Sequence, residues 1–130
     1  MNTTEVLLVI FEPDDKLWKQ FKPNNFIATR TCTAKEVLQF LAENRNKSSK
    51  VIVVISDPEN GEGVDVEIRS LIQEIKKKYQ DITIIATSSN YNWANQILQT
   101  GCHLTTARSR LDQTIESTLN PKKKIPFPWR

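Results

Sequence analysis

Residues 51–58 read VIVVISDP, so five β-branched residues run unbroken into Ser56, Asp57 and Pro58. An aliphatic run of strand length with no polar alternation is typical of a strand buried on both faces, as in a parallel sheet covered by helices. Aspartate and proline directly after it favour a turn. We therefore predict a central parallel strand over 51–55 whose carboxyl end carries Asp57.

Other apolar runs alternate with amphipathic segments along the chain. Ile68, Leu71, Ile72 and Ile75 recur at the spacing of one helix face. Five such strand–helix units predict an α/β fold, a doubly wound five-stranded parallel sheet of the flavodoxin-like type with helices on both faces. The other strands are expected at 6–11, 26–31, 82–86 and 102–107.

Three helix boundaries are indicated by local motifs. Thr33 and Glu36 fit a capping box, in which each side chain accepts a hydrogen bond from the other residue's backbone. Ser109 and Asp112 are a second candidate for the same motif. Gly101 is placed to end the helix before it.

The fold class predicts where a ligand would bind. In open α/β sheets ligands lie outside the carboxyl ends of the strands. Ile10, Phe11, Asp57, Thr87 and the residues after Ala107 are therefore expected to converge on one cleft.

Length and composition favour one globular domain, with 130 residues, of which 38% are hydrophobic and 25% charged. No apolar run approaches the ~20 residues needed to cross a bilayer, so we expect no membrane partner. The polar start leads into an apolar run too short for a signal peptide, which favours a cytoplasmic protein.

The net charge of +3 is unevenly distributed. Four of the 18 basic residues lie in 120–130, which holds no acid, so the rest carries 14 basic against 15 acidic residues, about −1. Nucleic-acid-binding domains normally spread a basic face over the fold. A near-neutral body with a short basic tail therefore predicts no nucleic-acid partner.

The cysteines and the histidine suggest no metal site. Cys32 and Cys102 belong to no cluster with ligand spacing, and we expect two buried thiols, with a disulfide as the alternative. His103 has no companions at metal spacing and is interpreted as structural.

From residue 6 to 119 the pattern resembles the CheY-like receiver domains of response regulators. Glu12 and Pro13 follow the first strand, as they often do in that family. Asp57 stands where the family carries its phosphoacceptor, and Thr87 where it has a hydroxyl that binds the phosphoryl group. Arg108, seven residues after Gly101, takes the place of an essential lysine.

Two departures bear on the chemistry that the resemblance implies. Ile10 and Phe11 replace the two acids that help to bind Mg²⁺ in the family, and their side chains offer no oxygen ligand. Glu12 is the nearest acid that could compensate. The planar guanidinium of Arg108 differs in shape from the compact ammonium of lysine. Arg108 could pair with Asp57 and hold the site in one state. We therefore expect a remnant phosphorylation site without a metal or other cofactor.

The resemblance implies a stand-alone pseudo-receiver, a signalling module that acts through protein–protein interaction and is not an enzyme. The alternative is a working response regulator, phosphorylated on Asp57 by a histidine kinase with Mg²⁺. A flavodoxin-like small-molecule binder is a third possibility, but the first strand–helix turn has no glycine-rich phosphate loop.

The chain is divided into a receiver-like domain, 1–119, and a basic, proline-rich tail, 120–130. The tail is either a disordered or packed-back end, or a docking segment with Phe127 and Trp129 as anchors. A signalling protein, either a histidine kinase or an output protein, is the expected partner. By analogy with receivers, a homodimer through the last two units, with Trp93 or Leu111 at its surface, is also possible.

Overall fold

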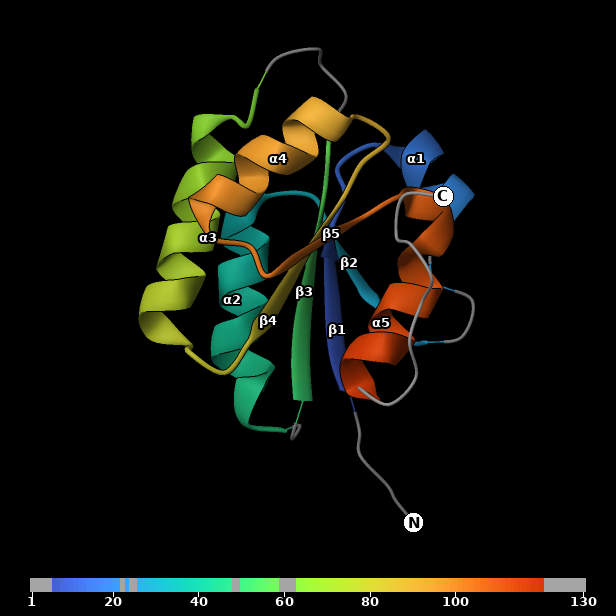
Figure 1. Cartoon of the computed structure of the whole chain (residues 1–130). Coiled ribbons are helices and arrows are strands. Elements are labelled where there is room, and N and C mark those ends of the chain that lie inside the picture. Colours follow the sequence, from blue (N-terminus) through green and yellow to red (C-terminus); the bar gives the residue numbers. More distant parts are fainter. Residues whose placement is uncertain (1–5, 22, 24–25, 48–49, 59–62, 121–130) are drawn as a thin grey trace.

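The computed structural model describes residues 6–21, 23, 26–47, 50–58 and 63–120 (Figure 1). Its sheet has five strands in the order β2-β1-β3-β4-β5, and every neighbouring pair is parallel. The predicted doubly wound five-stranded sheet is confirmed. The strands are β1 (Val6–Phe11), β2 (Thr29–Thr31), β3 (Lys50–Ser56), β4 (Thr83–Thr87) and β5 (Leu104–Thr106).

Helices cover both faces of this sheet (Figure 1). Helices α2, α3 and α4 lie on one face, and α1 and α5 on the other, so the chain crosses from face to face as it winds outward from β1. The helices are α1 (Asp15–Phe21), α2 (Ala34–Asn44), α3 (Val66–Lys78), α4 (Tyr91–Thr100) and α5 (Leu111–Leu119), with 3-10 turns η1 (Arg45–Lys47) and η2 (Arg108–Arg110).

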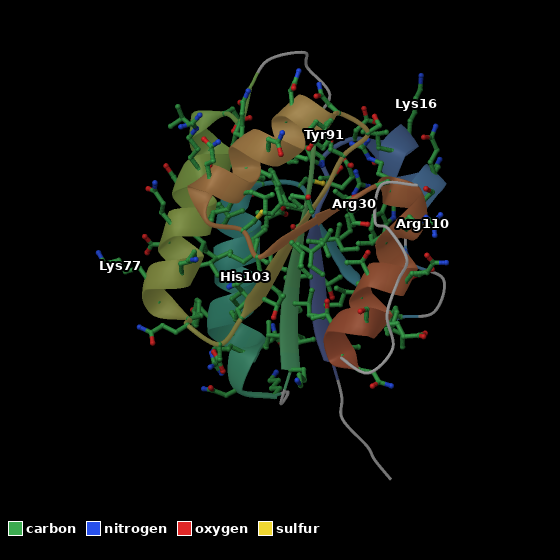
Figure 2. All side chains as sticks on the ribbon, viewed as in Figure 1. Lys16, Arg30, Lys77, Tyr91, His103 and Arg110 are labelled. Carbon is green, nitrogen blue, oxygen red and sulfur yellow. The ribbon has the colours of Figure 1, made fainter. Side chains whose placement is uncertain are left out.

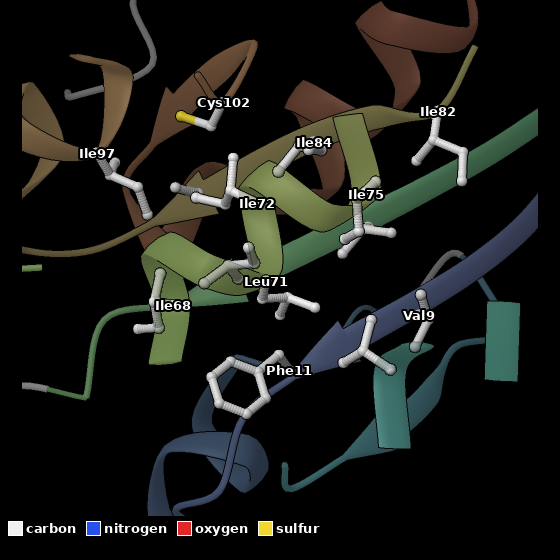
Figure 3. Close-up of a cluster of buried hydrophobic side chains, with 14 of the residues drawn as sticks. Val9, Phe11, Ile68, Leu71, Ile72, Ile75, Ile82, Ile84, Ile97 and Cys102 are labelled. Carbon is white, nitrogen blue, oxygen red and sulfur yellow. The ribbon is translucent and has the colours of Figure 1, made fainter. Parts of the chain in front are cut away.

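The alternation of side chains along each strand produces two cores. In β1, Val9 and Phe11 point into the core beneath α2, α3 and α4, while Leu8 and Ile10 point into the core beneath α1 and α5. The larger core includes the predicted helix face of α3, as Figure 3 shows. Both faces of the central strands are thus buried, which explains their unbroken aliphatic sequence.

Two of the three predicted helix boundaries are confirmed. At the start of α2, the Glu36 amide donates to Thr33 Oγ1 and the Thr33 amide donates to Glu36 Oε1, each at 3.1 Å. Gly101 ends α4 with a φ of 122°, a backbone conformation that side chains with a Cβ rarely adopt. The capping box at Ser109 was wrong, because residues 108–110 form η2 and α5 begins after Arg110 with no side-chain cap.

Other expectations need correction. The strand predicted over 26–31 is shorter, because Phe26 and Ala28 pack against the smaller core before β2 begins. The last strand is also shorter than 102–107. Cys32 is exposed, not buried, whereas burial raises the pKa of the Cys102 thiol to about 12. Both thiols are free.

None of the helices in the described part of the chain combines the length and the apolar composition needed to cross a membrane.

Candidate functional site

A row of buried polar residues crosses the carboxyl end of the sheet on the side of α5. Ser56 of β3 pairs with Thr87 of β4, which pairs with Thr106 of β5. Glu12 continues the row on the other side, since the preceding residue of β1 pairs with the residue before Ser56. All four are 0% exposed. The fold therefore gathers polar groups at the edge where ligands of such sheets bind.

Asp57 lies at this edge, next to the row. Its side chain is buried, with 2% exposure, and Oδ2 accepts a hydrogen bond from Ser88 Oγ at 2.6 Å. Ser88 Oγ also accepts from the Asn90 amide at 2.8 Å, so the loop after β4 fixes the hydroxyl. The sequence interpretation missed Ser88, although it directly follows Thr87.

Thr87 reaches Asp57 through the main chain: the Asp57 amide donates to the Thr87 carbonyl at 2.9 Å. The Thr87 hydroxyl is buried and has no hydrogen-bond partner within the described ranges. Thr87 and Asp57 are thus neighbours, but the hydroxyl that binds the carboxylate belongs to Ser88.

Arg108 enters the site from η2. Its Nη2 donates to the Asp57 carbonyl oxygen at 2.6 Å and to Ser56 Oγ at 3.3 Å. Arg108 therefore contacts Asp57 at the main-chain carbonyl, while the charge pair with the Asp57 carboxylate stays a prediction. A guanidinium suits this position because it presents several donors in one plane.

Glu12 completes the site from the end of β1. Oε1 accepts a hydrogen bond from the Ser56 hydroxyl, and Oε2 accepts from the Asp14 amide at 2.9 Å. Burial raises the pKa of Glu12, while the Ser56 and Asp14 hydrogen bonds and the charge of Arg108 act in the opposite direction. Glu12 thus reaches the carboxyl edge, where its carboxylate is held by protein donors.

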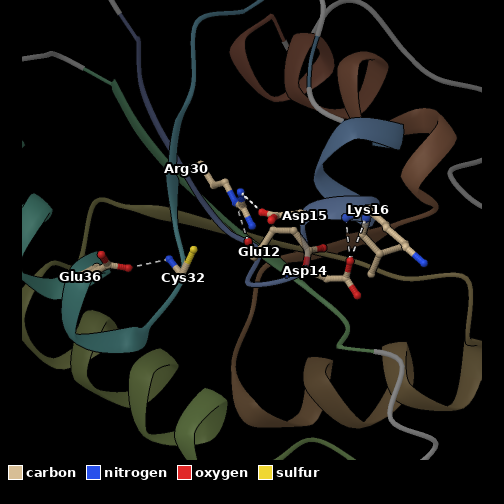
Figure 4. Close-up of polar contacts among 8 residues, drawn as sticks. Glu12, Asp14, Asp15, Lys16, Arg30, Cys32 and Glu36 are labelled. Carbon is tan, nitrogen blue, oxygen red and sulfur yellow. Dashed lines mark hydrogen bonds and ion pairs between the residues drawn. The ribbon is translucent and has the colours of Figure 1, made fainter.

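Arg30 holds the loop after β1 from the side of β2 (Figure 4). Its Nε donates to the Glu12 carbonyl at 2.9 Å, and its Nη1 lies 2.6 Å from Asp15 Oδ1. The guanidinium also lies 5.9 Å from the centre of the Trp18 ring. No pattern in the sequence indicates this role, because residues 12, 15 and 30 meet only across the β1–β2 pair.

Two side chains at this edge, at the positions where the sequence resemblance puts metal ligands, cannot bind a magnesium ion. Mg²⁺ prefers near-octahedral oxygen coordination, usually including one or two carboxylates. The Ile10 and Phe11 side chains point into the two cores, and the Glu12 carboxylate accepts from Ser56 and Asp14. Across the described ranges, no group of three or more histidines, cysteines, aspartates or glutamates is placed to hold a metal ion.

The remaining predicted positions concern the binding of a partner or a second copy. Phe127 and Trp129 fall outside the described residues. Trp93 and Leu111 were wrong as candidates for a dimer surface, because both side chains are buried in the cores. The large apolar side chain exposed at the start of α4 is Tyr91 (Figure 2).

Comparisons with known proteins agree with this architecture. No protein-family model matches the chain, and no curated protein matches it. Among solved structures, it resembles an atypical orphan response regulator described as phosphorylation-independent, with 19% identity, coverage of 88% of this chain and 94% of that one, and a TM-score of 0.57.

Two other solved structures are similar to the same degree. A proposed response regulator from Chloroflexus aurantiacus has 13% identity, covers 91% of this chain and 96% of its own, and gives a TM-score of 0.58. The receiver domain of the histidine kinase CKI1 from Arabidopsis thaliana, complexed with Mg²⁺, has 16% identity, coverages of 88% and 91%, and a TM-score of 0.55. The strand order, the two helical layers and these similarities show that the chain has the CheY-like receiver fold of response regulators.

Proposed function

We propose that this chain is a pseudo-receiver, a signalling module that works through protein–protein interaction and without phosphorylation. One observation carries the proposal: the two residues at the positions of the family's metal-binding acids, Ile10 and Phe11, pack into the two cores. The similarity to an atypical orphan regulator described as phosphorylation-independent supports it. A role in two-component signalling would place the protein in the cytoplasm.

The chemistry of phosphoryl transfer gives the physical reason. Transfer to an aspartate brings two anions together, so catalysis rests on positioning and on charge neutralisation by a metal ion and a cation. Arg108 supplies a cation near Asp57. Because Ile10 and Phe11 stand where the family has its metal-binding acids, we expect no metal ion to supply the other charge. Asp57 would then have to accept a phosphoryl group without it.

Incubation with Mg²⁺ and acetyl phosphate, followed by intact-mass measurement, tests the proposal. The mass of the wild-type protein is expected to stay unchanged, as is that of Asp57→Asn. A stable gain of one phosphoryl group in the wild type that is absent from Asp57→Asn would refute a phosphorylation-independent function.

The rival function is a working phosphoacceptor modified on Asp57 by a histidine kinase. The position of Asp57 at the carboxyl end of β3, beside a hydroxyl that hydrogen-bonds it, favours this alternative. It predicts saturable Mg²⁺ binding by calorimetry that disappears in Asp57→Asn. A titration without heat of binding at millimolar Mg²⁺ would exclude it.

The tail is the candidate for partner docking. Its lysines would steer it toward an acidic surface, and Phe127 and Trp129 would fill apolar pockets there. We expect a pull-down with the full chain to capture a signalling protein that a chain ending at Leu119 does not. The double variant Phe127→Ala/Trp129→Ala, which keeps the lysines, separates anchoring from steering. Equal capture by all three forms would show that the tail is not the docking segment.

A further inference from the structure

Glu12 and Arg108 carry opposite charges and both contact the Ser56 hydroxyl. Ser56 donates to Glu12 Oε1 and accepts from Arg108 Nη2 at 3.3 Å. Arg108 also donates to the carbonyl of the residue after Ser56, at 2.6 Å. One small side chain thus links the end of β1, the end of β3 and η2.

The chemistry of a hydroxyl makes this link directional. Serine has one O–H donor and two acceptor lone pairs. Ionised Glu12 can only accept, so it orients the Ser56 hydrogen toward β1 and leaves a lone pair for the guanidinium. A charged hydrogen bond polarises the next bond in the chain. The charge of Glu12 therefore reaches Arg108 through Ser56.

Burial increases the energetic importance of the contacts between Glu12, Ser56 and Arg108. Glu12 and Ser56 are both fully buried. An unpaired charge in such a place costs several kcal/mol, which hydrogen bonds and an opposite charge offset. The arrangement of η2 that keeps Arg108 over Ser56 is therefore stabilised by the carboxylate of Glu12, across the width of β3.

We propose that Ser56 is a positioning residue that couples Glu12 to Arg108 and so holds η2 in one arrangement without a phosphoryl group. The inference rests on the proposed function, because contacts that hold η2 in one arrangement are expected in a module that does not switch by phosphorylation. It assigns to β1, β3 and η2 an internal connection made only of side chains.

Amide hydrogen exchange in Ser56→Ala tests this coupling. The reporters are the Arg110 amide, which donates to the Ala107 carbonyl at 2.9 Å, and the Leu111 amide, which donates to the Arg108 carbonyl. Both are expected to exchange at least about tenfold faster in Ser56→Ala, while amides in the middle of β3 and β4 keep their wild-type rates. Equal acceleration in η2 and in the strands, or none in η2, would overturn the proposal.

Thr87→Val is the matched control. Thr87 lies beside Ser56 in the same row and is equally buried. The substitution to valine replaces its hydroxyl with a methyl group of similar size. The Arg110 and Leu111 amides are expected to exchange at wild-type rates in this variant. If Thr87→Val accelerated them as much as Ser56→Ala does, the effect would belong to the whole row and not to Ser56.

The second test is non-additivity. Glu12→Gln removes the charge but keeps the shape, and it is expected to accelerate exchange in η2 when Ser56 is present. In the Ser56→Ala background the same substitution should add less, since the connection through Ser56 is already cut and only the direct attraction between the two charges remains. Independent, multiplying effects would contradict the coupling.

The exchange experiment and the phosphorylation experiment can fail independently of each other. Selective exchange in η2 together with phosphorylation of Asp57 would refute the pseudo-receiver and keep the coupling. An unchanged mass together with uniform exchange would keep the pseudo-receiver and refute the coupling.

Discussion

The carboxylate of Glu12 shows how opposing effects are balanced within one residue. Burial disfavours its charge, and the hydrogen bonds from Ser56 and Asp14 favour it, as does the positive charge of Arg108. Burial prevails, so the pKa lies above the ordinary value of 4.5. Ionising Glu12 therefore costs more in the folded protein than in the unfolded chain.

This imbalance predicts a pH dependence of stability. Between pH 4.5 and the raised pKa of Glu12 the native state binds more protons than the unfolded state. The free energy of unfolding of the wild type, relative to Glu12→Gln, is therefore expected to fall as the pH rises through this window. Urea denaturation of both proteins across the window measures the difference. A difference that grows with pH would contradict the sign.

For His103 we expect a pH dependence of stability with the opposite sign. Its Nδ1 accepts the Ile84 amide at 3.0 Å, which requires an unprotonated nitrogen, and burial, followed by the charge of Lys76, lowers its pKa. Stability is expected to be lost as the pH falls below the ordinary value of 6.5, because the unfolded chain then binds the proton first. This slope should vanish in His103→Gln, and its survival in that variant would assign it to another group.

Among the elements, α2 has the most completely capped start. Thr33 and Glu36 exchange hydrogen bonds, and the Ala34 amide donates to Glu67 Oε2 of α3 at 3.1 Å. Amides that would lack partners at the helix start are thus satisfied by side chains from two elements. The same contact ties the start of α2 to the first turn of α3.

Removal of the cap has a predictable cost. Thr33→Ala is expected to lower the free energy of unfolding by ~0.5–2 kcal/mol, because the Glu36 amide loses its acceptor. Thr33→Ser retains the hydroxyl and serves as the control. Chemical denaturation measures the change in the free energy of unfolding of both variants, from the shift of the midpoint when the denaturant dependence is unchanged. Equal losses in the two would show that the methyl group, and not the cap, matters.

For the whole molecule, the division into two cores decides which substitutions are tolerated. Ile72 of α3 lies fully buried in the larger core, whereas Ile27 is 94% exposed. Both isoleucines look alike in the sequence, but only one removes apolar surface from water. The contribution of an isoleucine to the free energy of unfolding therefore depends on whether it lies in a core between sheet and helices, and not on the residue type alone.

The pair Ile72→Ala and Ile27→Ala tests this directly. The first is expected to lower the free energy of unfolding by ~2–5 kcal/mol, through lost burial and a cavity. The second should stay within ~0.5 kcal/mol of the wild type, as for exposed positions in general. Thermal or chemical unfolding gives both values, and a costly Ile27→Ala would mean that this side chain is covered.

The amino-acid sequence alone was enough to predict the sheet and the start of α2, because aliphatic runs such as 51–55 and the capping box at Thr33 are local patterns with local physical causes. It also placed Asp57, Thr87 and Arg108 at one edge, since the carboxyl ends of parallel strands must meet there. The hydrogen-bond partners of these residues, in contrast, follow from the folded structure and not from a sequence pattern. Ser88 binds Asp57 because of the loop after β4, and Ser56 joins Glu12 to Arg108 because three segments far apart in the chain converge. Hydrogen bonds depend on tenths of an ångström and on direction, and these are fixed by packing rather than by sequence spacing.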